Sequence, residues 1–168
     1  MKCIGLMSDT HGFLEKDMLD YFSACDEIWH AGDIGENAVA ARLADFKHFR
    51  AVYGNIDGTA IRMAYPEDLR FTCEGLDVFI THIGGYPGRY VPRVRKILEA
   101  DPPGLFICGH SHILKVQPDP KLGLLHINPG ACGHEGFHLM RTIVRFKIHA
   151  ARIEDLEVVE LGRRGRPS

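Results

Sequence analysis

The chain has 168 residues, of which 45% are hydrophobic and 25% are charged, as in ordinary soluble globular proteins. Twenty Lys and Arg residues against 22 Asp and Glu residues give a formal net charge of -2. This balance supplies no general positive field for nucleic acid or an anionic membrane. The apolar runs fall far short of the ~20 residues that cross a bilayer, and the first residues lack the features of a signal peptide. We therefore expect a cytoplasmic protein whose five scattered cysteines are free thiols.

In the first two thirds of the chain, short apolar runs alternate with segments of helical spacing. The expected strands are Cys3–Met7, Glu27–His30, Phe49–Tyr53, Leu76–Thr81 and Leu105–Cys108. Helices are expected between Leu14 and Cys25, from an Asn37 cap to Phe46, and from Pro92 onward, where proline suits the first helical turn.

The last third is mostly strand. Lys115–Gln117 and Leu124–Ile127 flank a turn rich in proline and glycine and predict a hairpin, and Ile143–Ile148 and Arg152–Leu161 predict two further strands. Strand-helix alternation followed by strands favours an α/β protein in which two mixed sheets pack together with helices outside. We expect one domain over residues 1–161, followed by a frayed basic tail over residues 162–168.

Each of the five expected strands in the first two thirds is followed by a polar cluster. The clusters contain Asp9 and His11, then Asp33, then Asn55 and Asp57, then His82, and finally His110 and His112. Ligands bind beyond the carboxyl ends of parallel strands, so these clusters are expected to converge on one site. The two-residue spacing in Asp-x-His and His-x-His also lets both side chains of a pair point the same way in extended backbone.

Each cluster alone has an ordinary structural explanation, as a capped turn, a turn dipeptide or a hydrogen-bonded core histidine. Five clusters at strand ends that supply only Asp, Asn and His are much better explained by a metal site. Such mixed nitrogen and oxygen ligands suit Mn²⁺, Fe²⁺, Co²⁺, Ni²⁺ or Zn²⁺, whereas Ca²⁺ and Mg²⁺ prefer oxygen.

The order D-x-H, GD, GN, H, GHxH resembles the signature of calcineurin-like metallophosphoesterases, and GNID is similar to their small bacterial and archaeal phosphodiesterase subgroup. A vacuolar sorting subunit of the retromer complex shares that fold. The resemblance implies a four-layer α-β-β-α sandwich. It also implies that Asp9, His11 and His112 bind one metal, that Asn55, His82 and His110 bind the second, and that Asp33 bridges both.

Two metals held in this way can activate a shared water for attack on phosphorus and clamp the phosphoryl oxygens. We therefore expect a dinuclear metal-dependent phosphoesterase, with Mn²⁺ favoured, that hydrolyses a P–O bond through a metal-bridging hydroxide. Asp33, Asn55 and His82 would contribute to catalysis through the metals and the phosphate. The partner would be a small phosphodiester or phosphate ester, and self-association into a homodimer or a higher homo-oligomer stays open.

Ile56 stands where many family members have a histidine that is thought to assist the leaving group. Isoleucine carries no proton, which favours diesters with good leaving groups. Asp57 is the nearest replacement acid, although a hydrogen-bond acceptor role fits it better. In the Gly-rich loop after His82, Arg89 and Tyr86 are candidate substrate contacts, with an ordinary solvated loop as the alternative.

Two other functions stay open. The chain could be a protein-binding scaffold without turnover, like the retromer subunit, although such scaffolds tend to lose metal ligands. It could also be a metal sensor or storage protein, which would take up metal and hydrolyse no phosphate ester.

Overall fold

The computed structural model describes residues 1–165 and places ten strands in two five-stranded sheets. The first sheet has the strand order β10-β9-β1-β2-β3 and the second β4-β5-β6-β8-β7. The first contains β1 (Lys2–Met7), β2 (Glu27–His30), β3 (His48–Ala51), β9 (Met140–His149) and β10 (Arg152–Arg163). The second contains β4 (Asp68–Cys73), β5 (Leu76–Thr81), β6 (Leu105–Ile107), β7 (Leu114–Asp119) and β8 (Leu124–Pro129). Both sheets mix parallel and antiparallel pairs, as expected.

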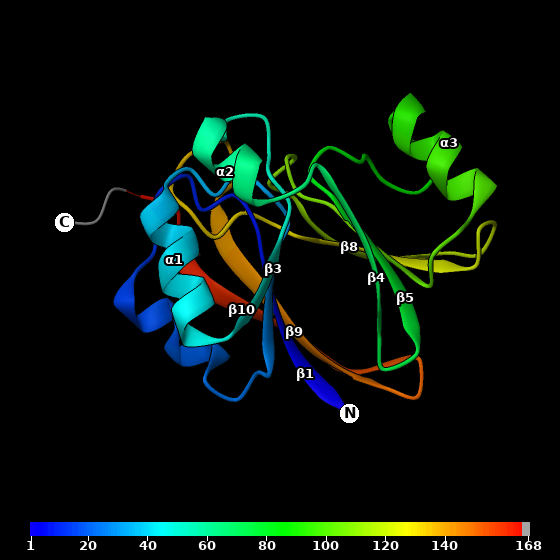
Figure 1. Ribbon diagram of the computed structural model, residues 1–168, viewed down its shortest axis with the longest axis horizontal. Coiled ribbons are helices and arrows are strands. Elements are labelled where there is room, and N and C mark those ends of the chain that lie inside the picture. The colour runs from blue at the N-terminus through cyan, green and yellow to red at the C-terminus, as the bar shows by residue number, and fades with distance from the viewer. Residues whose placement is uncertain (166–168) are drawn as a thin grey trace.

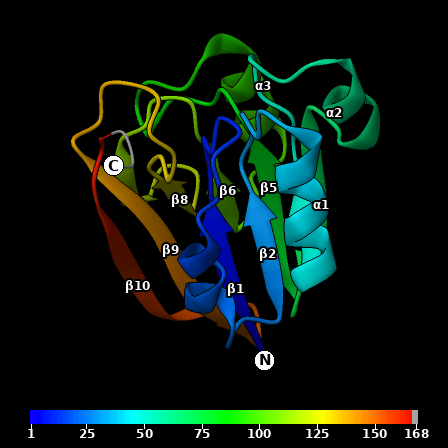
Figure 2. The same ribbon diagram turned by 90° about the vertical axis from the view of Figure 1, so that its left-hand side faces the viewer.

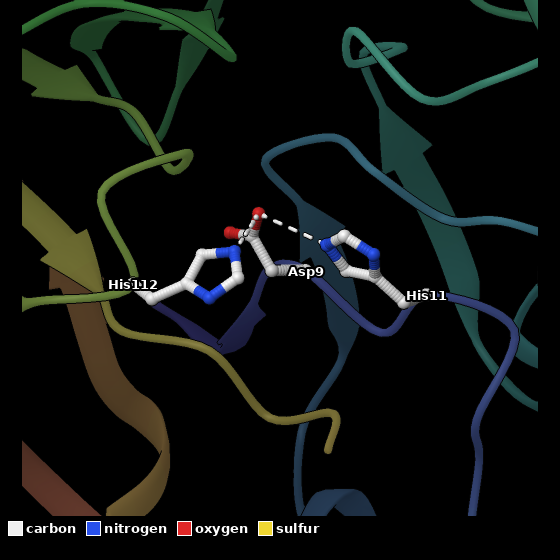
Figure 3. A group of neighbouring side chains, drawn as sticks. All are labelled: Asp9, His11 and His112. Atoms are coloured by element: carbon white, nitrogen blue, oxygen red, sulfur yellow. Dashed lines mark ion pairs between the residues drawn. The ribbon is translucent and has the colours of Figure 1, made fainter. Parts of the chain in front are cut away.

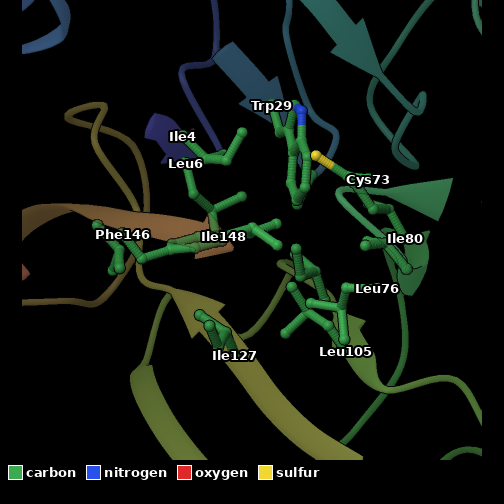
Figure 4. Packing of buried hydrophobic residues seen from close by; sticks show 14 of the residues in the cluster. Ile4, Leu6, Trp29, Cys73, Leu76, Ile80, Leu105, Ile127, Phe146 and Ile148 are labelled. Atoms are coloured by element: carbon green, nitrogen blue, oxygen red, sulfur yellow. The ribbon is translucent and has the colours of Figure 1, made fainter. Parts of the chain in front are cut away.

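Three apolar clusters hold the layers together. Between the two sheets, side chains such as Ile4 and Trp29 pack against Ile80 and Leu105 (Figure 4). On the outer face of the first sheet, a second cluster packs under α1 (Asn37–Phe46), and on the outer face of the second sheet a third packs under α3 (Pro92–Ala100). Figure 1 shows α1 and α3 on opposite sides of the paired sheets. The expected α-β-β-α sandwich is confirmed.

The segment after β1 differs from the expectation. Instead of a helix between Leu14 and Cys25, it forms two three-residue 3₁₀ turns, η1 (Lys16–Met18) and η2 (Asp20–Phe22). Four of the apolar side chains that suggested a helix, Leu14, Met18, Phe22 and Cys25, are still buried, whereas Tyr21 is exposed. Phe22 lies directly over Gly5 of β1. The prediction was wrong because periodic burial in a short connection can be met by consecutive turns as well as by a continuous helix.

Parallel strands bring distant loops to one end of the sandwich. β1 is parallel to β2 and β2 to β3, while β5, β6 and β8 run parallel in the second sheet. The carboxyl ends of β1 and β2 therefore meet at one edge, which Figure 2 shows at the top of the molecule. The short helix α2 (Thr59–Ala64) lies in the connection from β3 of the first sheet to β4 of the second. The sequence predicted neither α2 nor β4.

The carboxyl-terminal strand is longer than expected. β10 runs to Arg163 and pairs with β9 as far as Met140, so the first two residues of the expected tail belong to the sheet. Residues 166–168 of that tail lie outside the described residues. Within residues 1–165, no helix has the length and apolar character needed to cross a membrane.

Candidate metal centre

The polar clusters predicted from the sequence meet at the carboxyl edge of the strands. Asp9 and His11 follow β1, Asp33 follows β2, Asn55 follows β3, His82 follows β5, and His110 and His112 follow β6. Their ligand atoms form two groups, and within each group the atoms lie within 4.8 Å of one another. The first group is Asp9, His11 and His112, and the second is Asp33, His82 and His110.

The first group is centred on the Asp9 carboxylate. Its Oδ1 lies 3.1 Å from His112 Nε2 and 3.8 Å from His11 Nε2. Figure 3 shows both imidazole rings directed at this carboxylate from opposite sides. The side chain of Asp9 is fully buried, so these nitrogens face a carboxylate that is shielded from bulk water.

The second group includes Asn55 and connects to the first through Asp33. The Asn55 Oδ1 lies 3.1 Å from His82 Nε2 and 3.0 Å from His110 Nδ1. The Asp33 Oδ2 lies 3.2 Å from His82 Nε2 in the second group and 3.5 Å from His11 Nε2 in the first. A carboxylate oxygen between the two groups is the arrangement that a bridging ligand requires.

The backbone at this edge is held in an unusual conformation. Five of the seven candidate ligands, Asp9, His11, Asp33, His110 and His112, have φ between 48° and 68°, although none is glycine. Such left-handed positions cost about 1–3 kcal/mol each and cluster at functional sites. Space is also restricted, because a Cβ on Gly54 would collide with the Asp33 carboxylate. The backbone conformation that points these side chains inward therefore lowers the stability of the fold.

Hydrogen bonds behind the candidate ligands fix their orientation. His82 Nδ1 lies 2.7 Å from the Ala31 carbonyl, which keeps the proton on Nδ1 and leaves Nε2 as a lone-pair donor. Ser8 Oγ donates to Asp9 Oδ2 over 2.6 Å and leaves Oδ1 for the histidines. The role of Ser8 was not predicted, because its only signal in the sequence is its position just before Asp9.

His30 joins two of the site loops. Its Nδ1 accepts from the Gly32 N–H, so Nε2 carries the proton and donates to Thr10 Oγ1 over 3.0 Å. Thr10 Oγ1 donates in turn to the Ile34 carbonyl over 2.8 Å. Burial lowers the pKa of His30 to about 4, so it remains neutral. His30 therefore ties the loop of Asp9 to the loop of Asp33.

The charges of the site are coupled. Burial alone would raise the pKa of Asp9, but the neighbouring His11 and His112 lower it well below its usual range. Burial would also raise the pKa of Asp33, and His82 lowers it. The pKa of His11 is raised by Asp9. The two carboxylates thus stay ionised and attract cations, either protons on the histidines or a metal.

The residues at this edge fit divalent metal ions. Asp9 Oδ1 and His11 Nε2 are buried and have no hydrogen-bond partner within residues 1–165, which is costly unless something else occupies them. The donors are four imidazole nitrogens with carboxylate and amide oxygens, a set typical of Mn²⁺, Fe²⁺ and Zn²⁺ sites. Asp9, His11, Asp33, Asn55, His82, His110 and His112 could together hold two ions.

Asp57 lies behind this centre. Its carboxylate is buried and accepts hydrogen bonds from the backbone N–H groups of Ile34, Gly35 and Gly54. These bonds use both oxygens to join the loops that carry Asp33 and Asn55. The arrangement favours the acceptor role over a leaving-group acid.

A cleft of about 300 Å³ opens beside the second group. Asn55 and His82 form part of its wall, together with Tyr53, Arg62 and Arg93. Arg93 contacts Asp68 over 2.6 Å and Thr81 over 3.0 Å at the side of this cleft. Neither Arg62 nor Tyr53 belongs to a recognised motif, so their place in the cleft could not be predicted from the sequence.

The predicted substrate contacts Tyr86 and Arg89 do not line this cleft. Tyr86 lines a separate cavity of about 160 Å³ with Ser111, the residue between His110 and His112, and Lys115 Nζ lies 4.3 Å from its ring centre. Arg89 is exposed, and its backbone N–H donates to the Tyr86 carbonyl in a tight turn. Their contact with substrate stays a prediction.

Known proteins share this sequence pattern and fold. The profile of the calcineurin-like phosphoesterase superfamily domain matches residues 1–151. A probable metallophosphoesterase from Methanocaldococcus jannaschii is 30% identical over 136 residues, which cover 76% of this chain and 67% of that protein.

Solved structures agree on the fold. A structure described as a novel archaeal phosphodiesterase has a TM-score of 0.76 at 22% identity, covering 95% of this chain and 99% of that one. Vps29 from Entamoeba histolytica, solved with Zn²⁺, has a TM-score of 0.73 at 14% identity, covering 94% and 98%. With the profile match over residues 1–151, these findings show that the chain belongs to the calcineurin-like phosphoesterase superfamily.

Proposed function

We propose that the protein is a dinuclear metal-dependent phosphodiesterase. The observation that carries the proposal is the position of Asp33, whose Oδ2 lies within 3.5 Å of an imidazole nitrogen in each of the two ligand groups. A single carboxylate shared between two groups of ligands is suited to two neighbouring cations. The superfamily match supports hydrolysis of a phosphate ester.

Two divalent ions at these ligands would supply Lewis acidity and activate a water for attack on phosphorus. The chain's own residues hold and orient that chemistry. Asp9 and Asp33 contribute two negative charges, while the amide of Asn55 adds none, so the loaded site keeps a net positive charge that attracts a phosphate ester. Mn²⁺ is the proposed ion, with iron, zinc, nickel and cobalt also compatible with the ligands.

The loop of Asn55 supports a diester over a monoester. Ile56 is 46% exposed beside Asn55 and cannot donate a proton, while the Asp57 carboxylate is occupied by backbone N–H groups. Neither side chain can protonate a departing alkoxide. Diesters with acidic leaving groups need such help least, so we infer that they are the better substrates.

Metal removal and replacement test the proposal. The protein is stripped with a chelator, dialysed, and assayed with bis(p-nitrophenyl) phosphate before and after Mn²⁺ is added. We expect no turnover without metal and recovery with Mn²⁺. His112→Ala removes a ligand of the first group and should abolish the recovery, because Asp9 then loses its nearest imidazole.

The matched control is His149→Ala, which replaces an exposed histidine at the end of β9. It should keep wild-type turnover. Full activity in the metal-stripped protein, or wild-type turnover in His112→Ala, would refute the metal-dependent esterase.

A protein-binding scaffold is the second candidate, and it has an observation in its favour. Near the first ligand group, the side chains of Phe137 and Leu139 are 100% and 82% exposed, and Ile113, next to His112, is 62% exposed. Exposed apolar side chains of this size often mark a binding surface. Solved structures of similar fold include Vps29 proteins.

Hydrolysis assays distinguish the enzyme from the scaffold. Phe137→Ser with Leu139→Ser should leave hydrolysis of the small diester unchanged if the protein is an enzyme. A scaffold without turnover would hydrolyse none of a panel of diesters and monoesters under any of the five metals. That result would replace the enzyme proposal.

A further inference from the structure

Arg62 of α2 stands between the Asn55 loop and the cleft beside it. Its Nε donates to the Asp57 carbonyl over 2.6 Å, and its Nη2 lies 3.2 Å from the Asn55 carbonyl and 3.3 Å from the Gly54 carbonyl. The guanidinium also packs 4.5 Å from the ring centre of Tyr53. One side chain thus bonds three backbone carbonyls within residues 54–57, the loop that carries the candidate metal ligand Asn55.

The charge of Arg62 is not balanced locally. Arg93, in the same cleft, is paired with Asp68 over 2.6 Å and lies 3.7 Å from Glu67. Arg62 has only neutral carbonyl partners and no ion pair within residues 1–165, and its Nη1 makes no hydrogen bond there. An arginine remains protonated throughout the accessible pH range, so it brings a permanent positive charge to the cleft.

The position of this charge suits a phosphate ester. Arg62 shares the cleft with Asn55 and His82, so an anion that reaches this half of the centre meets the guanidinium next. Guanidinium groups bind phosphate oxygens with directed, charge-assisted hydrogen bonds. The cleft of about 300 Å³ also has the apolar side chains Ile83 and Val91 in its wall, which could contact an ester group of aromatic-ring size.

We propose that this cleft is the binding site for the phosphate ester, with Arg62 both as the residue that holds its anionic oxygen and as the residue that positions the Asn55 loop. This proposal rests on the proposed function and adds the place and the charge that receive the substrate. Two separable effects follow, one on anion affinity and one on the second metal site.

Calorimetry on three arginine variants separates the two effects. The variants are Arg62→Ala, Arg62→Lys and the control Arg42→Ala, which also removes an arginine bonded to a backbone carbonyl but lies in α1, outside the cleft. Inorganic phosphate is titrated into protein saturated with Mn²⁺, and Mn²⁺ is titrated into the stripped protein.

Arg62→Ala should weaken phosphate binding at least about tenfold, because it removes a charge-assisted hydrogen bond to the anion. The same variant should also bind the second Mn²⁺ ion more weakly than the wild type does. Arg62→Lys keeps the charge but cannot bond all three carbonyls, so it should recover more phosphate affinity than Mn²⁺ affinity. Arg42→Ala should match the wild type in both titrations.

Failure of the two proposals can be told apart. If Arg62→Ala binds phosphate as tightly as the wild type at saturating Mn²⁺, Arg62 does not hold the anion and the inference is overturned, even where diester hydrolysis is normal. If the wild type hydrolyses no diester but Arg62→Ala still weakens phosphate binding, the esterase proposal fails and the anion site stands.

Discussion

Glu27, buried at the start of β2, is bonded by Lys2, Trp29 and Arg50, whereas Asp9, buried just beyond the end of β1, keeps one oxygen without a hydrogen bond within residues 1–165. The two carboxylates lie at opposite ends of β1 and β2, which are neighbouring strands of the first sheet. One end satisfies its charge with protein groups. The other gathers a second carboxylate, Asp33, and leaves its nitrogens and oxygens directed at a common space.

This contrast separates stability from function. A buried charge with a full set of partners keeps the fold intact, while a buried charge without them is retained only where a ligand will complete it. The backbone shows the same division, because five of the seven candidate ligands occupy left-handed conformations. We therefore expect bound metal to stabilise the fold through the ligands at the carboxyl edge. Substitutions at the amino end should not change that stabilisation.

The largest expected effect is on activity at the carboxyl edge. Asp33→Ala removes the carboxylate shared by both ligand groups and should lower turnover of bis(p-nitrophenyl) phosphate by about 100- to 1,000-fold or more. The unfolding free energy of the metal-free variant should lie within about 1 kcal/mol of the wild-type value, because the burial of Asp33 and the like charge of Asp9 offset most of its attraction to His82. Denaturant unfolding and steady-state kinetics measure the two quantities. A variant that is inactive only because it is unfolded would contradict the division.

The converse substitution lies at the amino end. Glu27→Gln breaks the contacts with Lys2 and Arg50 and should cost about 3 kcal/mol of unfolding free energy at neutral pH. Folded protein should keep wild-type turnover at 25 °C. Loss of turnover in proportion to the loss of stability, in protein that is still folded, would show that the two ends are not independent.

The same carboxylate gives a pH dependence. Burial alone would raise the pKa of Glu27, but the bonds from Lys2, Trp29 and Arg50 hold it at about 2, below the ordinary 4.5. Because the folded pKa is the lower one, the stability from Glu27 is present above about pH 4.5 and is lost as the pH falls toward 2. Unfolding curves between pH 6 and pH 2 should converge for the wild type and Glu27→Gln. Parallel curves would contradict the assignment.

Metal addition should act only at the carboxyl edge. Mn²⁺ at about 100 times its dissociation constant stabilises by about 2.7 kcal/mol per site, which corresponds to about 5–10 °C in melting temperature for a chain of this size. The shift should shrink in His112→Ala and be unchanged in Glu27→Gln. An equal shift in His112→Ala would mean that the ion binds elsewhere.

The smallest expected effect concerns the leaving group. Ile56→His places a titratable ring beside Asn55 and should raise monoester hydrolysis by up to about tenfold relative to diester hydrolysis, since general acids help most when the leaving group is poor. The ratio of p-nitrophenyl phosphate to bis(p-nitrophenyl) phosphate turnover measures it. An unchanged ratio would remove the argument that Ile56 favours diesters.

Much of this architecture was readable in the sequence, for physical reasons. Apolar runs predict the strands β5 and β8, and the position of Pro92 predicts the start of α3. The ligand positions could be predicted because parallel strands end at the same edge of a sheet. The turns η1 and η2 could not be predicted. The spacing of Leu14, Met18 and Phe22 indicates which side chains are buried, but it does not determine the backbone hydrogen-bond pattern.

The cleft beside the second ligand group could not be predicted from the sequence either. Tyr53 lies in the loop after β3, Arg62 in α2 and Arg93 in α3, and only the approach of these three segments to one another brings them into one cleft. Arg62 carries no local signal, because its partners are backbone carbonyls that any residue supplies. The side chains that would bind metal are thus encoded by motif, and those that would select the substrate are encoded by packing.

The central claim is that seven side chains at the carboxyl edge hold two metal ions. Equilibrium dialysis of the stripped protein against Mn²⁺, with bound metal counted by mass spectrometry, tests it most directly. The account predicts two ions per chain for the wild type and at most one, weakly bound, for Asp33→Ala. One ion in the wild type, or two that persist in Asp33→Ala, would contradict it.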